Sequence, residues 1–318
     1  MTSGSKDMSD TAGDQPDQHE AGGKQGDKPA KDKVNWLSEI FGLALMLMGV
    51  LLFHSLVAKP FYIPSESMLP NLLVGDRLIV SKYPYGWSWA SASFHALPRG
   101  EWRVMGRTPE YGDIVIPVNP VRDEDYIKRV VARPGDRFAV VNGQIILNGK
   151  PVPQAVEPPL RIPMDENMKC DFGFDPATGK PFDYKHKLAD GTWVCEPPTL
   201  RETMPNGATY LIIDHMDQPL DNYPEITIPK DSVFVMGDNR DHSADSRAEV
   251  WEAGLGGPVP MANIGGRAEF ITFSLDGTTG LNPLSWFSSL RGGRAWTTLR
   301  PAIASPAIGS EDKHAEGK

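Results

Sequence analysis

The sequence predicts a mainly β protein, in which a single N-terminal transmembrane helix precedes an antiparallel β-sheet or barrel domain with an inserted subdomain. Three observations predict it: one long apolar run, many short strand-like runs, and abundant turn residues. The 318 residues include 31 glycines and 29 prolines, about a fifth of the chain, which favours a turn-rich β protein over a helical bundle. With 40% hydrophobic and 23% charged residues, the chain is neither largely disordered nor a polytopic membrane protein.

Charge and metal-ligand residues exclude several function classes. The formal net charge of −9 argues against a nucleic-acid partner, because phosphate binding needs a basic surface. Two cysteines are too few for a disulfide-dense mini-domain or a four-cysteine zinc site. The seven histidines show no H-E-x-x-H spacing. We therefore expect no metal and no cofactor.

The first element is a membrane helix over residues 36–58. Residues 1–35 are almost entirely polar and predict a disordered tail, as does the C-terminal stretch 304–318. From Phe41 to Ala58 the chain reads FGLALMLMGVLLFHSLVA, which as a helix spans roughly 27 Å of a hydrocarbon layer of about 30 Å. The run lacks the polar stripe of a core helix, and Leu56 and Ala58 fit poorly with a cleavable signal.

Lysines predict the orientation of this helix. Four of them, Lys24, Lys28, Lys31 and Lys33, lie upstream, against Lys59 immediately downstream. The positive-inside rule then leaves the N-terminus in the cytoplasm and the rest of the chain outside.

Residues 59–303 form the predicted β domain. Its strand-like runs are 77–80, 113–118, 126–132, 137–141, 144–147, 209–213, 232–236 and 268–273. Asn142-Gly143 predicts a type I′ hairpin, and Asn148-Gly149 closes the next strand. Residues 153–207 have weak strand signals and form an inserted excursion with Cys170 and Cys195. A disulfide is favoured there because disulfides persist outside the cytoplasm; two free thiols are the alternative.

The first motif, Pro64-Ser65-Glu66-Ser67-Met68-Leu69-Pro70, follows the helix. Two prolines predict a stiff, extended segment, in which Ser65 and Ser67 face one side and Glu66 faces the other. Alone, this segment is as well explained by an ordinary loop.

The second motif is Asp125-Tyr126-Ile127-Lys128-Arg129-Val130-Val131. A lysine within a β-branched strand either lies on the solvent face of an edge strand or points inward, where desolvation makes it a base.

The third motif, Gly237-Asp238-Asn239-Arg240-Asp241-His242-Ser243-Ala244-Asp245-Ser246-Arg247, predicts a loop of mutually hydrogen-bonded polar groups. A surface turn and a calcium loop are the alternatives. The calcium interpretation is weak because the spacing does not match an EF-hand and two arginines would oppose the cation.

Together, the three motifs strongly resemble those of bacterial type I signal peptidases, which are membrane-anchored Ser/Lys endopeptidases. The order of the membrane helix, PSxSMxP, Gly75-Asp76, YIKR-V, the PGD at 134–136 and GDNRDxSxDSR matches that family. Departures are His242 where Asn is usual, Glu66 where Gly is frequent, and Asn71 where Thr is frequent. None of them falls on a catalytic position.

The resemblance implies roles for individual residues. Ser67 is the nucleophile, and Lys128 is the general base that takes its proton. Ser243 orients the lysine, and the Ser65 hydroxyl with the Ser67 backbone N–H forms the oxyanion hole. Asp245 and Arg247 form a supporting salt bridge. The substrate cleft is lined by Phe61, Ile63, Pro64, Tyr126 and Ile127.

The resemblance also implies the substrate and the location. Signal peptides of secretory preproteins are removed after A-x-A-like small residues through an acyl-enzyme. The protein is then a single-pass inner-membrane enzyme with a periplasmic catalytic domain, in contact with the lipid bilayer and near the secretion translocon. Alternatives are a membrane-anchored binding protein, a Ser/Lys self-cleaving repressor, and a specialised signal peptidase for one conjugation or pilus substrate.

Overall fold

The computed structural model describes residues 35–304, so the predicted tails over 1–35 and 304–318 lie almost wholly outside the described residues. The chain divides into two units, residues 1–45 and 46–318.

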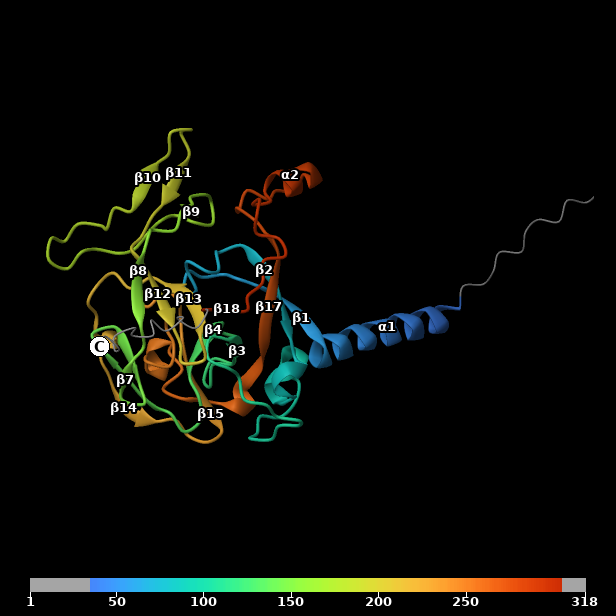
Figure 1. Ribbon diagram of the computed structural model, residues 1–318. Helices are drawn as coiled ribbons and strands as arrows, with labels where there is room; N and C mark the ends of the chain where they lie inside the picture. The colour runs from blue at the N-terminus through green and yellow to red at the C-terminus, as the bar shows by residue number, and fades with distance from the viewer. Residues whose placement is uncertain (1–34, 305–318) are drawn as a thin grey trace, which may run out of the picture. The chain divides into compact units, whose positions relative to one another are not determined.

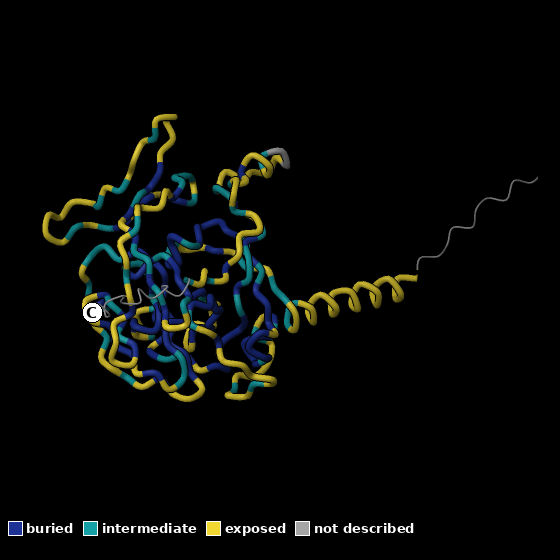
Figure 2. The backbone as a smooth tube through the Cα atoms, viewed as in Figure 1, coloured by how far each residue is buried: buried dark blue, intermediate teal, exposed yellow. Residues whose placement is uncertain are grey.

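Helix α1 covers Trp36–Leu56, and none of its residues is buried (Figure 2). Among residues 35–304 it alone is long and apolar enough to cross a membrane, which suggests a membrane anchor. It ends two residues before the predicted boundary at 58, because Ala58 already pairs with Ser81 in the first strand pair.

A seven-stranded sheet forms the centre of the second unit, in the order β1-β2-β17-β3-β4-β15-β16 (Figure 1). All its pairings are antiparallel. Its strands are β1 (Ala58–Tyr62), β2 (Asp76–Ser81), β3 (Ile114–Pro117), β4 (Lys128–Ala132), β15 (Ser232–Met236), β16 (Val259–Pro260) and β17 (Ile264–Ser274).

Three smaller antiparallel sheets complete the unit, in the orders β18-β13-β12-β8, β14-β5-β6-β7 and β10-β11-β9. Their strands are β5 (Arg137–Val141), β6 (Gln144–Leu147), β7 (Lys150–Pro151), β8 (Gln154–Glu157), β9 (Ile162–Pro163), β10 (Lys185–Lys187), β11 (Trp193–Cys195), β12 (Thr199–Thr203), β13 (Ala208–Ile212), β14 (Tyr223–Thr227) and β18 (Ala302–Ile303).

The helical segments of this unit are short. They are η1 (Tyr83–Tyr85), η2 (Trp89–Ser91), η3 (Ser93–His95), η4 (Pro219–Asp221), η5 (Val250–Glu252), η6 (Met261–Asn263) and α2 (Pro283–Ser288). The prediction of a mainly β fold behind one apolar helix is therefore confirmed.

The sequence located strands of the central sheet and of the sheet β14-β5-β6-β7. Predicted strands 137–141, 144–147 and 232–236 coincide with β5, β6 and β15. Asn142 and Gly143 join β5 to β6 with positive φ angles of 47° and 77°, which confirms the type I′ hairpin, because both central residues of that turn need φ > 0.

The excursion over 153–207 contains more strand than the sequence indicated. It holds β8 to β12, three of which form the small sheet β10-β11-β9. Cys170 and Cys195 form the favoured disulfide, with a Cα–Cα distance of 5.6 Å. Both cysteines and Phe172 are buried in one apolar cluster with Leu69 and Leu73, so this region packs against the segment that follows Ser67.

Candidate active site

Ser67 lies in a tight turn that the apolar core holds in place. Met68 and Leu69 are fully buried, and the Leu69 N–H donates to the Glu66 carbonyl at 3.0 Å. The predicted extended backbone is therefore wrong, because the segment bends and turns from Ser65 onward. The turn still places the two hydroxyls on one side, with Ser65 Oγ 3.4 Å from Ser67 Oγ.

Lys128 points inward from the first position of β4. It pairs with Val115 of β3, and only 4% of the residue is exposed. Its Nζ donates a hydrogen bond to Ser67 Oγ at 2.9 Å, and it lies 5.6 Å from the centre of the Tyr126 ring. Of the two interpretations of this lysine, the structure supports the inward one.

Burial lowers the pKa of Lys128 to about 8, because a desolvated site disfavours the charged ammonium. Asp245 and Asp238 oppose this effect, and Arg247 adds to it. Lowering a lysine pKa from 10.5 to about 8 corresponds to about 3 kcal/mol against the charged form. A substantial fraction of the amine is then neutral just above pH 7 and able to accept a proton.

Both carboxylates near the lysine already have arginine partners. Asp238 accepts two hydrogen bonds from the Arg129 guanidinium, each of 2.6 Å, and Asp245 accepts two from the Arg247 guanidinium, each of 3.0 Å. A buried carboxylate without such a partner would hold the proton on Lys128 more strongly. The predicted Asp245–Arg247 ion pair is therefore present, while the Arg129–Asp238 pair was not predicted.

The loop after β15 carries the rest of the third motif. Asn239 fixes the nucleophile segment: its backbone N–H donates to the Ser67 carbonyl at 3.1 Å, and its side-chain amide donates to the Glu66 carbonyl at 3.2 Å. Gly237 is needed because a Cβ there would lie 2.2 Å from Ser243 Oγ and 2.5 Å from the Ser67 carbonyl. The loop and the nucleophile turn therefore pack backbone against backbone.

Ser243 is buried beside Gly237, but its Oγ has no hydrogen-bond partner among the described residues. The expected contact with Lys128 is not formed in this structure, and the role of Ser243 in orienting the lysine stays a prediction.

A cleft of about 470 Å³ opens over these groups. Its lining includes Pro64, Tyr126 and Ile127, three of the predicted substrate-binding residues, beside Ser65, Ser67 and Lys128. Ile63 does not line it, because only 1% of Ile63 is exposed and its side chain packs in the core with Phe61 against it. Their predicted roles are not supported by this cleft.

The sequence did not predict two further polar interactions. Arg240 forms a buried ion pair with Glu202 of β12, and Asn71 donates to Asp238 at 2.7 Å. Arg240 lies inside the third motif, but its partner Glu202 lies in the excursion 153–207, where no pattern in the sequence identified it. In residues 35–304, the acidic and histidine groups close enough to share one metal ion are Asp214, Asp221 and Asp241, and none of them lines the cleft.

The comparisons with known proteins agree on one family. The family described as "Signal peptidase, peptidase S26" matches residues 33–273. A protein named Signal peptidase I from Rickettsia massiliae (strain Mtu5) is 29% identical over 76% of this chain and 80% of its own length. Proteins of the same name from Rickettsia typhi and Rickettsia akari are also 29% identical, each over 74% of this chain and over 80% and 79% of their own lengths.

Proposed function

This chain belongs to the signal peptidase family, peptidase S26, and we propose that it removes signal peptides by a Ser/Lys mechanism with Ser67 as nucleophile and Lys128 as general base. One observation carries the proposal: the buried amine of Lys128 lies 2.9 Å from Ser67 Oγ. A serine hydroxyl is a weak nucleophile until an adjacent base removes its proton, and a lysine is such a base only when its pKa is lowered.

The reaction then has two steps. Ser67 Oγ attacks the carbonyl carbon at the end of the signal peptide, and its proton passes to Lys128 Nζ. The tetrahedral oxyanion is held by the Ser67 backbone N–H and the Ser65 hydroxyl, whose oxygen lies 3.4 Å from Ser67 Oγ. As the intermediate collapses, Lys128 gives the proton to the leaving amine, and the signal peptide stays esterified to Ser67. Water attacks this ester with Lys128 again as base, which regenerates Ser67.

The lining of the cleft supports small, apolar substrate positions. Apart from the reacting groups, it presents Pro64, Tyr126, Ile127 and Ala244 beside Glu124, Asp125 and His242. Secretory signals end in A-x-A-like sequences, and small side chains of this kind suit an open, partly apolar groove. We extend the proposal to that specificity, with Asp245 and Arg247 as supporting residues and Ser243 as the residue that orients the lysine.

The site's location follows from the apolar helix. Helix α1 ends at Leu56 and the nucleophile turn follows shortly after it in the chain, so we propose a cut at the membrane surface, close to the translocon. Residues 59–303 then form the periplasmic catalytic domain of an inner-membrane protein, with the lysine-rich N-terminal side in the cytoplasm.

The test incubates a labelled preprotein with the detergent-solubilised protein and its Ser67→Ala variant. We expect the wild-type protein to release a fragment of signal-peptide length, with the mature N-terminus starting after a small residue. A membrane-anchored binding protein would leave the preprotein intact.

Depletion in the host separates a general from a specialised enzyme. Uncleaved precursors of many secreted proteins indicate the general role, whereas one accumulated precursor indicates a dedicated signal peptidase.

A further inference from the structure

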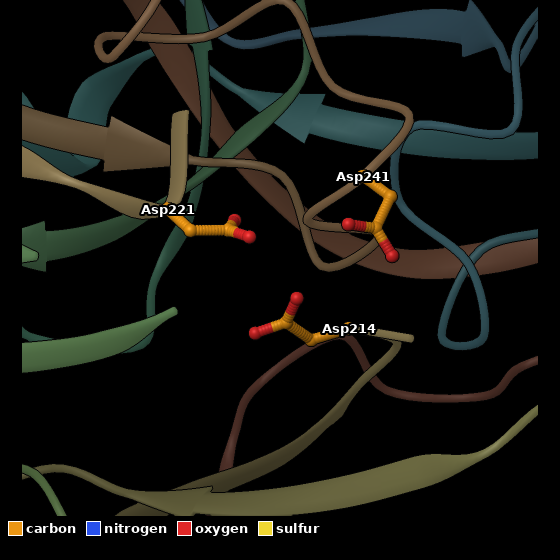
Figure 3. Close-up of side chains that lie close together, drawn as sticks. All are labelled: Asp214, Asp221 and Asp241. Atoms are coloured by element: carbon orange, nitrogen blue, oxygen red, sulfur yellow. The ribbon is translucent and has the colours of Figure 1, made fainter. Parts of the chain in front are cut away.

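Three carboxylates, one of them from the third motif, gather outside the lining of the cleft. Asp214 follows β13, Asp221 ends η4, and Asp241 lies in the loop after β15. Oxygens of all three lie within 4.8 Å of one another, and Figure 3 shows the carboxylates pointing toward a common space. The chain thus brings together acids from three separate segments.

No cationic side chain in residues 35–304 forms an ion pair with Asp214 or Asp221. Asp241 has only His215, whose Nε2 lies 3.4 Å from Oδ2. No arginine or lysine in residues 35–304 forms an ion pair with Asp241.

The two arginines of the loop compensate these acids only in part. Arg240 pairs with Glu202, and Arg247 pairs with Asp245. Both arginines still act on Asp214 and Asp221 at longer range and oppose the rise of their pKa values. The sequence argument that these arginines would oppose a cation is weaker in the structure, because each of them already pairs with another carboxylate.

One of these carboxylates is both buried and short of a partner. Only 4% of Asp221 is exposed. Its Oδ2 accepts from the Gln218 N–H at 2.8 Å, but its Oδ1 has no hydrogen-bond partner and, in Figure 3, the carboxylate faces the other two. Buried polar atoms nearly always have a hydrogen-bond partner, so we expect a hydrogen-bond donor or a cation at this oxygen.

The Asp241 carboxylate is held in place by hydrogen bonds. Its side chain is fully buried, and its oxygens accept from the His215 backbone N–H at 2.7 Å and from the Gln218 side-chain amide at 3.0 Å. Both donors are neutral amides, so they orient the carboxylate without neutralising its charge.

The chemistry of the ligands favours calcium among the common cations. Carboxylates suit hard cations rather than zinc or copper. Ca²⁺ accepts flexible, irregular arrangements of carboxylate oxygens, whereas Mg²⁺ demands a near-ideal octahedron and gives up its water molecules reluctantly. Three carboxylates from three separate segments suit the more tolerant ion.

We propose that Asp214, Asp221 and Asp241 bind a calcium ion. The ion would tie the segment 214–221 to the loop that contains Ser243 and Asp245. It would stabilise the loop behind the cleft without touching the reacting groups.

The test measures calcium binding and thermal unfolding of the full-length, detergent-solubilised protein after treatment with a chelator. Titration with CaCl₂ in a calorimeter should show one site. With a dissociation constant of about 10⁻⁴ M, typical of extracellular calcium modules, about 10 mM CaCl₂ should raise the Tm by ~5 °C. MgCl₂ at the same concentration should raise it much less.

The matched variants are Asp221→Asn, Asp214→Asn and, as control, Asp217→Asn, which changes an exposed acid of the same segment. In chelator, the first two should be at least as stable as the wild type, because repulsion between carboxylates is relieved. In calcium they should be less stable than the wild type, while Asp217→Asn should respond as the wild type does. A wild-type protein without a binding isotherm or Tm shift in calcium, or an undiminished shift in Asp221→Asn, would overturn the proposal. These readouts do not depend on cleavage.

Discussion

Two lysines are buried in the described part of the chain, Lys82 with 3% and Lys128 with 4% of the residue exposed. Burial lowers the pKa of each to about 8. Their surroundings differ: Lys128 donates to Ser67 Oγ at 2.9 Å. The Nζ of Lys82 instead lies 5.7 Å from the centre of the Phe61 ring and forms no hydrogen bond with a hydroxyl of residues 35–304. Desolvation alone therefore supplies a basic amine, and the position of a hydroxyl decides whether that amine is useful.

The largest expected effect comes from removing the amine of Lys128. Lys128→Met should reduce kcat/KM by about 10⁴-fold or more, and combining it with Ser67→Ala should add little, because the members of one catalytic unit are not additive. Lys128→Arg should be as inactive, since a guanidinium stays protonated. The measurement is the initial rate of preprotein cleavage.

Lys82→Met is the matched control for that loss. It removes an equally buried amine of the same pKa, so it should cleave close to the wild-type rate with unchanged or higher stability, because a buried ammonium is costly. Equal losses in Lys82→Met and Lys128→Met would mean that burial, rather than contact with Ser67, explains the result.

A smaller effect tests the second hydroxyl of the site. Ser65→Ala should lower kcat by roughly 10²–10³-fold, which is typical for the loss of one oxyanion donor, while Ser65→Thr should stay closer to the wild type. A fully inactive Ser65→Ala beside an active Ser67→Ala would show that the two serines have been assigned in reverse.

Ser243 should have a more moderate effect. If its buried Oγ orients Lys128 during turnover, Ser243→Ala should lower kcat by about 10–100-fold and shift the pH at which activity rises. A hydroxyl without this role is merely an unsatisfied buried group, and its removal would raise the Tm with cleavage unchanged. Rates at several pH values and a thermal melt distinguish the two results.

The smallest effect concerns the one histidine within a motif. His242 lines the cleft but stands where the family usually has Asn, so His242→Asn should cleave nearly as fast as the wild type. An inactive His242→Asn in the same cleavage assay would point to a histidine base instead of Lys128.

The sequence was most informative where its patterns are local. Alternation and turn residues predicted β5, β6, β15 and the Asn142-Gly143 hairpin because strand period and turn type depend on neighbouring residues. The motifs likewise brought Ser65, Ser67 and Lys128 to one cleft. Local patterns in the sequence therefore predicted much of the fold and the residues at the centre of the candidate site.

Long-range partners could not be predicted in this way. Glu202 meets Arg240 across 38 positions, and Asp238 meets Arg129 across 109 positions, so no local spacing connects them. The same holds for Lys82, whose burial depends on tertiary packing that no neighbouring residue marks.

The pH dependence of kcat/KM, measured in parallel for the wild type and Lys82→Met, tests the central claim most directly. A general base must be unprotonated, so activity should rise about tenfold per pH unit below the pKa of Lys128, which is about 8, and level off above it. Both proteins should show this limb, because Lys82 has the same lowered pKa but forms no hydrogen bond with a serine in the described part of the chain. A profile already flat from about pH 7, or a limb that disappears in Lys82→Met, would contradict Lys128 as the base.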